Sequence, residues 1–200
     1  RGGGQPHDTG KMVRGGDEFR VVFAGKFNGQ LSHEVDREGL NEGDKVRCVL
    51  DWDRRYTLMR MHTAAHVLAA TMNKELGALI TGNQLEAEKT RFDFNIEGFD
   101  REKFGEVVEK ANESMDLDLP LKIYTLPREE AMKIPGVVKL ANALPPSISE
   151  LRIVEIPDVD VQADGGTHVR NLNEVGKIEI LKLENKGKDN RRVYFTLANK

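Results

Sequence analysis

The chain has little cysteine and no long apolar run, and these two absences restrict its class. Cys48 is the single cysteine among 200 residues, so an intrachain disulfide is excluded and a reducing compartment, the cytoplasm, is expected. No apolar run approaches the ~18 residues that a membrane-spanning helix requires, so we expect no membrane span. Apolar residues make up 38% and charged residues 32% of the chain, as in a folded globular protein.

An excess of positive charge is also missing. The chain holds 30 basic and 33 acidic residues, a net charge of −3, which argues against binding nucleic acid through bulk charge. The charge is uneven, however, since residues 176–200 carry seven basic and three acidic side chains. This stretch fits a contact with a phosphate backbone and fits a solvated hairpin equally well.

Residues 1–52 are dominated by turn signals and short alternating runs. Strands are expected at 20–23, 29–31 and 45–50, separated by Gly-Gly, Asn-Gly and Glu-Gly-Asp turns. The pattern predicts a small β-barrel-like N-terminal domain. Because the sequence starts at Arg1 inside a glycine run and without Met, we expect this domain to be truncated at its start.

Residues 53–200 show a different periodicity. Apolar residues at helical spacing predict a helix over 56–76, closed by Gly77, and a second helix over 100–115. Strands are expected between and after these helices at 79–84, 90–95, 121–125, 152–156, 177–183 and 192–197. The second domain, residues 53–200, is therefore predicted to be α+β, with helices packed on an antiparallel sheet.

Two histidines in the first predicted helix are candidate metal ligands. His62 and His66 stand at positions i and i+4, so their imidazoles leave the helix on the same side. The pair alone is also compatible with two ordinary boundary histidines. Thr63 occupies the place where zinc metalloproteases carry a catalytic Glu, which removes the general base that a protease needs.

A second group of candidate ligands follows a predicted strand. In Asp164-Gly-Gly-Thr-His168 the two glycines allow the carboxylate and the imidazole to turn toward one point, although Asp-Gly-Gly is also an ordinary turn. Together with His62 and His66, these residues offer three histidines and a carboxylate. Such a set suits one tetrahedral Zn²⁺ per chain.

Four motifs resemble a known family when they are taken in order. They are the segments 2–10 (GGGQPHDTG), 56–66 (YTLMRMHTAAH), 91–94 (RFDF) and 165–169 (GGTHV). They resemble the editing domain of alanyl-tRNA synthetase and its free-standing relatives, the AlaX editing proteins. The resemblance covers the whole chain. It implies a zinc-dependent hydrolase that acts in trans on mischarged alanine tRNA, chiefly Ser-tRNA(Ala), with Gly-tRNA(Ala) as a further substrate.

One position departs from the family pattern. Many members have Cys before the Gly-Gly-Thr-His motif, where this chain has Asp164, and the single cysteine, Cys48, lies in the β-rich first domain and does not substitute for it. An Asp oxygen ligates zinc at about 2.0–2.2 Å, so Asp164 is either the fourth ligand or a neighbour of a three-histidine site with an open position. The sequence leaves both arrangements open.

The substrate contacts are predicted from the same resemblance. A pocket that prefers serine to alanine must offer the hydroxyl a polar partner, and Thr81, Asn83 and Gln84 are the candidates. Gly3 and Gly4 belong to the glycine-rich segment, where a bare backbone can approach the acceptor end of the tRNA closely. No side chain stands out as a general base, so catalytic residues stay unassigned, and a zinc ion could activate water or anchor the substrate.

Two other functions remain compatible with the sequence. The β-rich first domain and the basic C-terminal stretch would also suit a non-catalytic tRNA-binding module associated with translation. The metal-ligand set would also suit a zinc hydrolase of small esters. Retention of tRNA without deacylation would indicate the first, and hydrolysis independent of tRNA would indicate the second. The oligomeric state is not encoded in any recognisable pattern.

Overall fold

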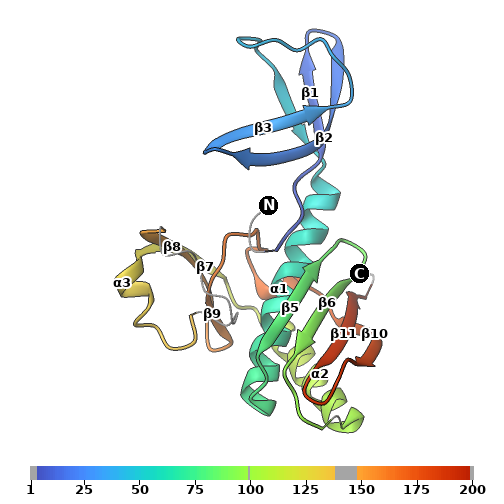
Figure 1. Ribbon diagram of the computed structural model, residues 1–200, viewed down its shortest axis with the longest axis vertical. Coiled ribbons are helices and arrows are strands. Elements are labelled where there is room, and N and C mark those ends of the chain that lie inside the picture. The colour runs from blue at the N-terminus through green and yellow to red at the C-terminus, as the bar shows by residue number, and fades with distance from the viewer. Residues whose placement is uncertain (1–3, 99, 138–147, 199–200) are drawn as a thin grey trace.

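A computed structural model gives the fold and describes residues 4–98, 100–137 and 148–198. The described strands form three antiparallel sheets that are joined by few helices (Figure 1). The predicted α+β class is therefore confirmed. None of the helices in the described ranges is long and apolar enough to cross a membrane.

The first sheet contains the N-terminal strands β1 (Gly10–Arg14), β2 (Asp17–Phe27), β3 (Gln30–Val35) and β4 (Arg47–Leu50), in the order β3-β2-β1-β4. Strand β2 pairs with β1 along its first half and with β3 along its second, after a register shift between Val21 and Phe23. Among the strands that the structure describes, no pairing joins β3 to β4, so this module is an open sheet.

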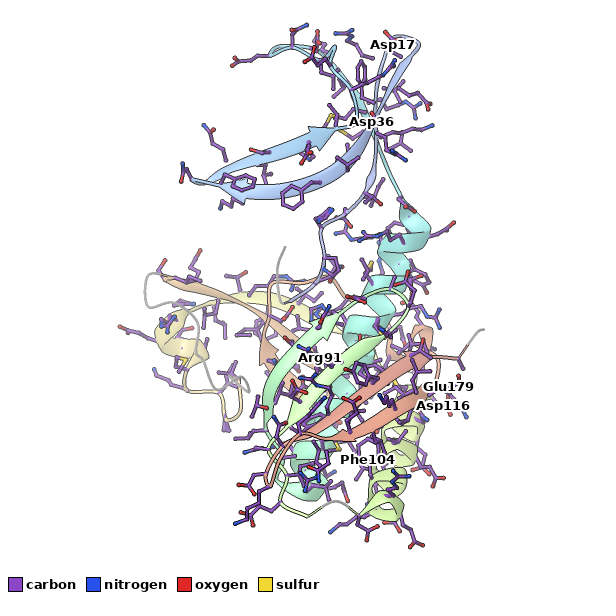
Figure 2. The ribbon with its side chains drawn as sticks, turned by 45° about the vertical axis from the view of Figure 1, so that its right-hand side comes forward. Asp17, Asp36, Arg91, Phe104, Asp116 and Glu179 are labelled. Atoms are coloured by element: carbon purple, nitrogen blue, oxygen red, sulfur yellow. The ribbon has the colours of Figure 1, made fainter. Side chains whose placement is uncertain are left out.

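The β2–β3 hairpin turns at Asn28 and Gly29, whose φ angles of 49° and 85° suit Asn-Gly in a tight hairpin turn. This hairpin projects from the module toward the side of the molecule that carries strands β7, β8 and β9, as Figures 1 and 2 both show.

Helix α1 (Trp52–Leu76) connects this module to the rest of the chain. It begins four residues before the predicted start because the Asp51 carboxylate accepts a hydrogen bond from the Arg54 backbone N–H and caps the first turn. It ends where the sequence predicts. Gly77 adopts a φ of 65° and its N–H donates to the carbonyl of Asn73.

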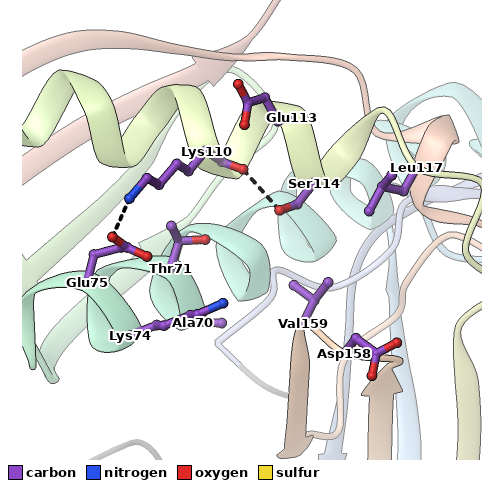
Figure 3. A pocket seen from close by; sticks show the side chains of 10 residues that line it. All are labelled: Ala70, Thr71, Lys74, Glu75, Lys110, Glu113, Ser114, Leu117, Asp158 and Val159. Atoms are coloured by element: carbon purple, nitrogen blue, oxygen red, sulfur yellow. Dashed lines mark hydrogen bonds and ion pairs between the residues drawn. The ribbon is translucent and has the colours of Figure 1, made fainter.

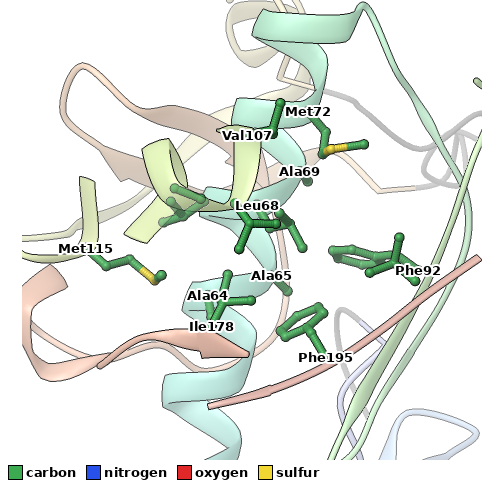
Figure 4. Close-up of a cluster of buried hydrophobic side chains, with 14 of the residues drawn as sticks. Ala64, Ala65, Leu68, Ala69, Met72, Phe92, Val107, Met115, Ile178 and Phe195 are labelled. Atoms are coloured by element: carbon green, nitrogen blue, oxygen red, sulfur yellow. The ribbon is translucent and has the colours of Figure 1, made fainter. Parts of the chain in front are cut away.

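The second sheet lies against α1 and α2 (Arg101–Met115). It contains β5 (Ile80–Leu85), β6 (Thr90–Phe94), β10 (Ile178–Asn185) and β11 (Arg191–Leu197), in the order β10-β11-β6-β5. Its inner face and the two helices enclose the main hydrophobic core (Figure 4). Each fully buried Leu or Phe contributes ~1.5–3 kcal/mol. Labelled core members are Ala64, Ala65, Leu68, Ala69, Met72, Phe92, Val107, Met115, Ile178 and Phe195.

Strands that the sequence predicts within one sheet are divided between the second sheet and a third sheet. Strands β7 (Lys122–Pro127), β8 (Glu150–Ile156) and β9 (Asp160–Ala163) form the third sheet in the order β7-β8-β9, and α3 (Arg128–Ala131) packs on β7 and β8. Helix α1 lies between the second and third sheets and contacts both β5 and β9 (Figure 1). Because α1 has a sheet on either side, its central residues are buried almost all round, including both histidines.

A hollow between α1 and α2 is occupied by structural contacts (Figure 3). Lys110 of α2 forms an ion pair with Glu75 of α1, and the Ser114 hydroxyl donates to the carbonyl of Lys110. The ion pair joins the two helices, whereas the Ser114 hydrogen bond lies within α2. No imidazole or thiol lines this hollow, so the candidate chemistry lies elsewhere.

Candidate metal centre

The two histidines of α1 lie in its buried middle. His62 is 2% exposed and His66 is 4% exposed, and their ring centroids are 5.2 Å apart. The i, i+4 spacing places both rings on one side of the helix, where the residues that follow β9 approach it. The helix therefore presents two donors that face the same space.

The turn after β9 brings the other two candidate ligands to the same place. His168 is buried, and its ring centroid lies 4.4 Å from that of His62 and 4.7 Å from that of His66. A Cβ atom on Gly166 would lie 2.2 Å from the His62 ring, so only glycine permits this approach. The Arg152 guanidinium donates to the carbonyl of Asp164 at 2.8 Å and fixes the start of the turn.

Four side chains thus form one cluster, in which ligand atoms of His62, His66, Asp164 and His168 all lie within 4.8 Å of one another. The Asp164 carboxylate lies 3.4 Å from Nε2 of His62, 4.0 Å from Nε2 of His66 and 3.3 Å from Nε2 of His168. The cluster could hold a metal ion, and each histidine would offer it the same ring atom.

The opposite ring nitrogens of His62 and His66 are held by partners that the sequence did not single out. Nδ1 of His62 lies 3.1 Å from the side-chain amide oxygen Oε1 of Gln5, and Nδ1 of His66 lies 2.9 Å from the Asp160 carboxylate. Both partners are acceptors, so both Nδ1 atoms carry the proton. Nothing in the spacing of the sequence indicates Gln5 or Asp160 as a partner.

The proton on His168 follows from the hydroxyl of Thr63. That hydroxyl donates its hydrogen to the Met59 carbonyl at 2.9 Å, so toward Nδ1 of His168, 3.3 Å away, it can only accept. With the proton on Nδ1, each histidine in its uncharged form has its lone pair on Nε2, the atom that faces Asp164. Thr63, which the sequence analysis used only to exclude a protease, therefore holds the ring of His168 in place through its Nδ1 atom.

Burial favours the uncharged imidazole at His62 and His168. It lowers the pKa of His62, and it lowers the pKa of His168 to about 3, although the Asp164 carboxylate opposes both shifts. Three Nε2 atoms and the Asp164 carboxylate thus converge on one point. Three imidazoles with one carboxylate match the ligands that zinc prefers. The donor set thus fits a zinc ion.

The contact between Asp160 and His66 provides a test of metal binding. Asp160→Asn is expected to weaken metal affinity about 10- to 100-fold, because Asp160 orients His66 and raises its basicity. Affinity would be measured by competition with a chromogenic chelator. Asp158→Asn is the matched control, since Asp158 is exposed two residues earlier and should leave affinity unchanged. Equal affinities for the two variants would contradict the assigned role of Asp160.

A narrow pocket opens beside the cluster, and one of the three predicted specificity residues lines it. Besides His62, His66 and Asp164, polar side chains of Asn83 and Gln162 line it. Its remaining walls are apolar and are formed by Ala65, Ala69, Ile80, Leu85 and Phe92. A small, mostly apolar pocket with a few polar groups suits a small amino-acid side chain next to a metal.

The other two predicted specificity residues do not line this pocket. Thr81 donates its hydroxyl to the Asp93 carbonyl at 3.2 Å, and Gln84 donates to Glu86 at 2.6 Å; both side chains are exposed. Gly4 lies against Asn83, since a Cβ atom at Gly4 would be 3.3 Å from the Asn83 amide. Gly3 lies outside the described residues.

Comparison with known proteins finds a matching family model and similar synthetases. Residues 151–194, which include Asp164 and His168, match the family model described as the threonyl and alanyl tRNA synthetase second additional domain. Two alanine--tRNA ligases, from Pyrobaculum aerophilum and Methanococcus maripaludis, are each 37% identical over 92% of this chain, which corresponds to 21% and 20% of their lengths.

Free-standing proteins are more similar still. The alanyl-tRNA editing protein AlaX-M of Methanosarcina barkeri is 51% identical over 98% of this chain and 84% of its own length. The protein of the same name from Saccharolobus solfataricus is 49% identical, with the same coverage of both chains. The chain therefore belongs to the AlaX-M family of alanyl-tRNA editing proteins.

Proposed function

We propose that this protein is a trans-editing hydrolase that removes serine, and glycine as a second substrate, from mischarged alanine tRNA. The observation that carries the proposal is the convergence of three Nε2 atoms and the Asp164 carboxylate beside the Asn83 pocket, in a chain about half identical to alanyl-tRNA editing proteins. The bond to be cleaved is the ester between the amino acid and the terminal ribose of the tRNA.

The residues present would hold one Zn²⁺ through His62, His66 and His168, with Asp164 as the fourth ligand or as a neighbour of an open position. When bound, zinc supplies a Lewis acid that polarises an ester carbonyl or acidifies a water molecule. Because an aminoacyl ester is already activated, the protein mainly has to position it. Gln5, Thr63 and Asp160 hold the imidazoles in place for this purpose.

The first experiment compares deacylation of Ser-tRNA(Ala) with and without a metal chelator. We expect rapid loss of serine from the tRNA, little loss of alanine from Ala-tRNA(Ala), and inhibition by the chelator that added Zn²⁺ reverses. Binding of tRNA without deacylation would instead indicate a non-catalytic module. Equal rates on a free serine ester and on Ser-tRNA(Ala) would indicate a hydrolase of small esters.

The preference for serine is expected to depend on Asn83. A pocket cannot exclude alanine by size, so it must reward the serine hydroxyl, and Asn83 is the predicted specificity residue that lines the pocket. Asn83→Leu keeps the approximate shape and removes the polar group. It should lower the ratio of serine to alanine deacylation rates by about 5- to 150-fold, the equivalent of one unpaired hydrogen-bonding group.

Two neighbours on β5 serve as controls for this experiment. Thr81→Val and Gln84→Leu remove polar groups that bond to Asp93 and Glu86 outside the pocket, so both variants should keep the wild-type ratio. The readout is the single-turnover rate on each charged tRNA. An unchanged ratio in Asn83→Leu would assign the discrimination to another group, of which Gln162 is the nearest polar alternative in the same pocket.

A further inference from the structure

A groove leads from the metal centre to the β2–β3 hairpin. Its walls come from three separate segments of the chain, namely residues 5–8, residues 24–26 and 31–33 of the hairpin, and residues 165–167 of the turn after β9. Gln5 and Gly166 line this groove and also contact His62 of the metal centre. The inner end of the groove therefore adjoins the candidate metal site.

The floor of the groove is fixed by the first turn of α1. Arg54 donates to the carbonyl of His7 at 2.7 Å, and Arg55 pairs with the Asp8 carboxylate at 3.0 Å. Gln5 is held by Thr167, whose backbone N–H donates to the side-chain amide oxygen Oε1 of Gln5 at 2.9 Å. The segment that passes under the hairpin is thus held in one conformation before any ligand arrives.

Three rings form a row along this floor and the hairpin. The His7 and Phe23 ring centroids are 4.6 Å apart, and those of Phe23 and Phe27 are 6.1 Å apart. Gly25 leaves room for the two phenyl rings, because a Cβ atom there would lie 2.7 Å from Phe23 and 3.3 Å from Phe27. We call His7, Phe23 and Phe27 the aromatic row.

The outer member of the row is unusually exposed. Phe27 is 57% exposed, and the neighbouring Leu31 is 78% exposed. Lys26 lines the groove from the face of β2 opposite to Phe27, because successive residues of a strand point to opposite faces. An exposed aromatic ring suits the base of an unpaired nucleotide, which stacks on it.

We propose that the aromatic row stacks unpaired bases of the tRNA 3′ end, just before the terminal nucleotide that carries the amino acid. This inference rests on the proposed function, since it requires the esterified nucleotide to lie at the metal centre. Stacking also explains how a chain with a net charge of −3 can hold RNA without a basic excess. Aromatic faces stack any base, so the row would position the end without reading its sequence.

The test is Phe27→Ala, assayed on Ser-tRNA(Ala). The tRNA concentration that gives half-maximal deacylation should rise about 5- to 100-fold, which corresponds to the loss of one stacked base. The rate at saturating tRNA should stay within about twofold, because the metal centre is untouched. Phe27→Trp should retain wild-type behaviour. Leu181→Ala is the matched control, since Leu181 is 55% exposed on β10 of the second sheet, away from the hairpin.

A second measurement does not depend on hydrolysis. The fluorescent base 2-aminopurine is placed next to the terminal nucleotide of uncharged alanine tRNA. Its fluorescence should be quenched by the wild type and by Phe27→Trp, and much less by Phe27→Ala. Hydrolysis of the serine ester of adenosine alone, which lacks the preceding nucleotides, should be equal in all variants.

The outcomes separate this inference from the proposed function. If the wild type deacylates Ser-tRNA(Ala) but Phe27→Ala has the same half-maximal concentration and quenching, the aromatic row is not an RNA contact. The same conclusion would follow if Phe27→Ala changed only the oligomeric state, because the exposed ring would then be a protein interface. A wild-type protein inactive on Ser-tRNA(Ala) would overturn both proposals.

Discussion

Exchanging His62 and His66 together for alanine is expected to reduce bound metal from about one ion per chain to none and to abolish deacylation of Ser-tRNA(Ala). The exchange removes two of four clustered donors and leaves only His168 and Asp164, too few for a stable zinc site. Alanine is the best helix former, so α1 should persist. Metal would be measured by elemental analysis of the purified protein, and activity by single-turnover deacylation.

Two controls make this experiment decisive. His33→Ala replaces an exposed histidine on β3 outside the cluster and should retain the full metal content. Circular dichroism of the double variant should show the wild-type helix content. Full metal occupancy in His62→Ala/His66→Ala would refute the assignment of the site.

The second large effect is expected at Asp164. If its carboxylate is a ligand, Asp164→Ala should weaken metal affinity by more than about tenfold. Even the loss of a residue that only hydrogen-bonds to a ligand costs that much. It would also leave three uncharged imidazoles without a counter-charge for the ion. Asp164→Cys should preserve or increase affinity, because a thiolate is a softer ligand for zinc and is the donor that many family members carry at this place.

The contrast between the two substitutions distinguishes the two possible ligand sets. Affinity would be measured by chelator competition, with Asp158→Asn as a control for the loss of a nearby carboxylate. Equal affinity of the wild type, Asp164→Ala and Asp164→Cys would assign zinc to the three histidines alone. Asp164 would then serve the turn, where it accepts the Gly166 N–H.

Local interactions explain which parts of the fold could be predicted from the sequence. The end of α1 was correct because Gly77 is a local left-handed cap, and the start was four residues late because the Asp51 cap precedes the apolar periodicity. The division of the C-terminal strands into two sheets was missed. It depends on α1 being covered on two sides, which is a property of packing and not of any single segment.

By itself, the sequence determined the local geometry of the donors. The i, i+4 spacing puts His62 and His66 on one side of a helix, and Gly-Gly lets Asp164 and His168 turn together, because both features act within a few residues. Only the tertiary structure decided the rest. The partners Gln5, Asp160 and Thr63 lie 57, 94 and 105 residues from the histidines they hold. Contacts at such separations exist only after the sheets have packed on α1, so no local pattern encodes them. The same packing turns Asn83 into the pocket and Thr81 and Gln84 away from it.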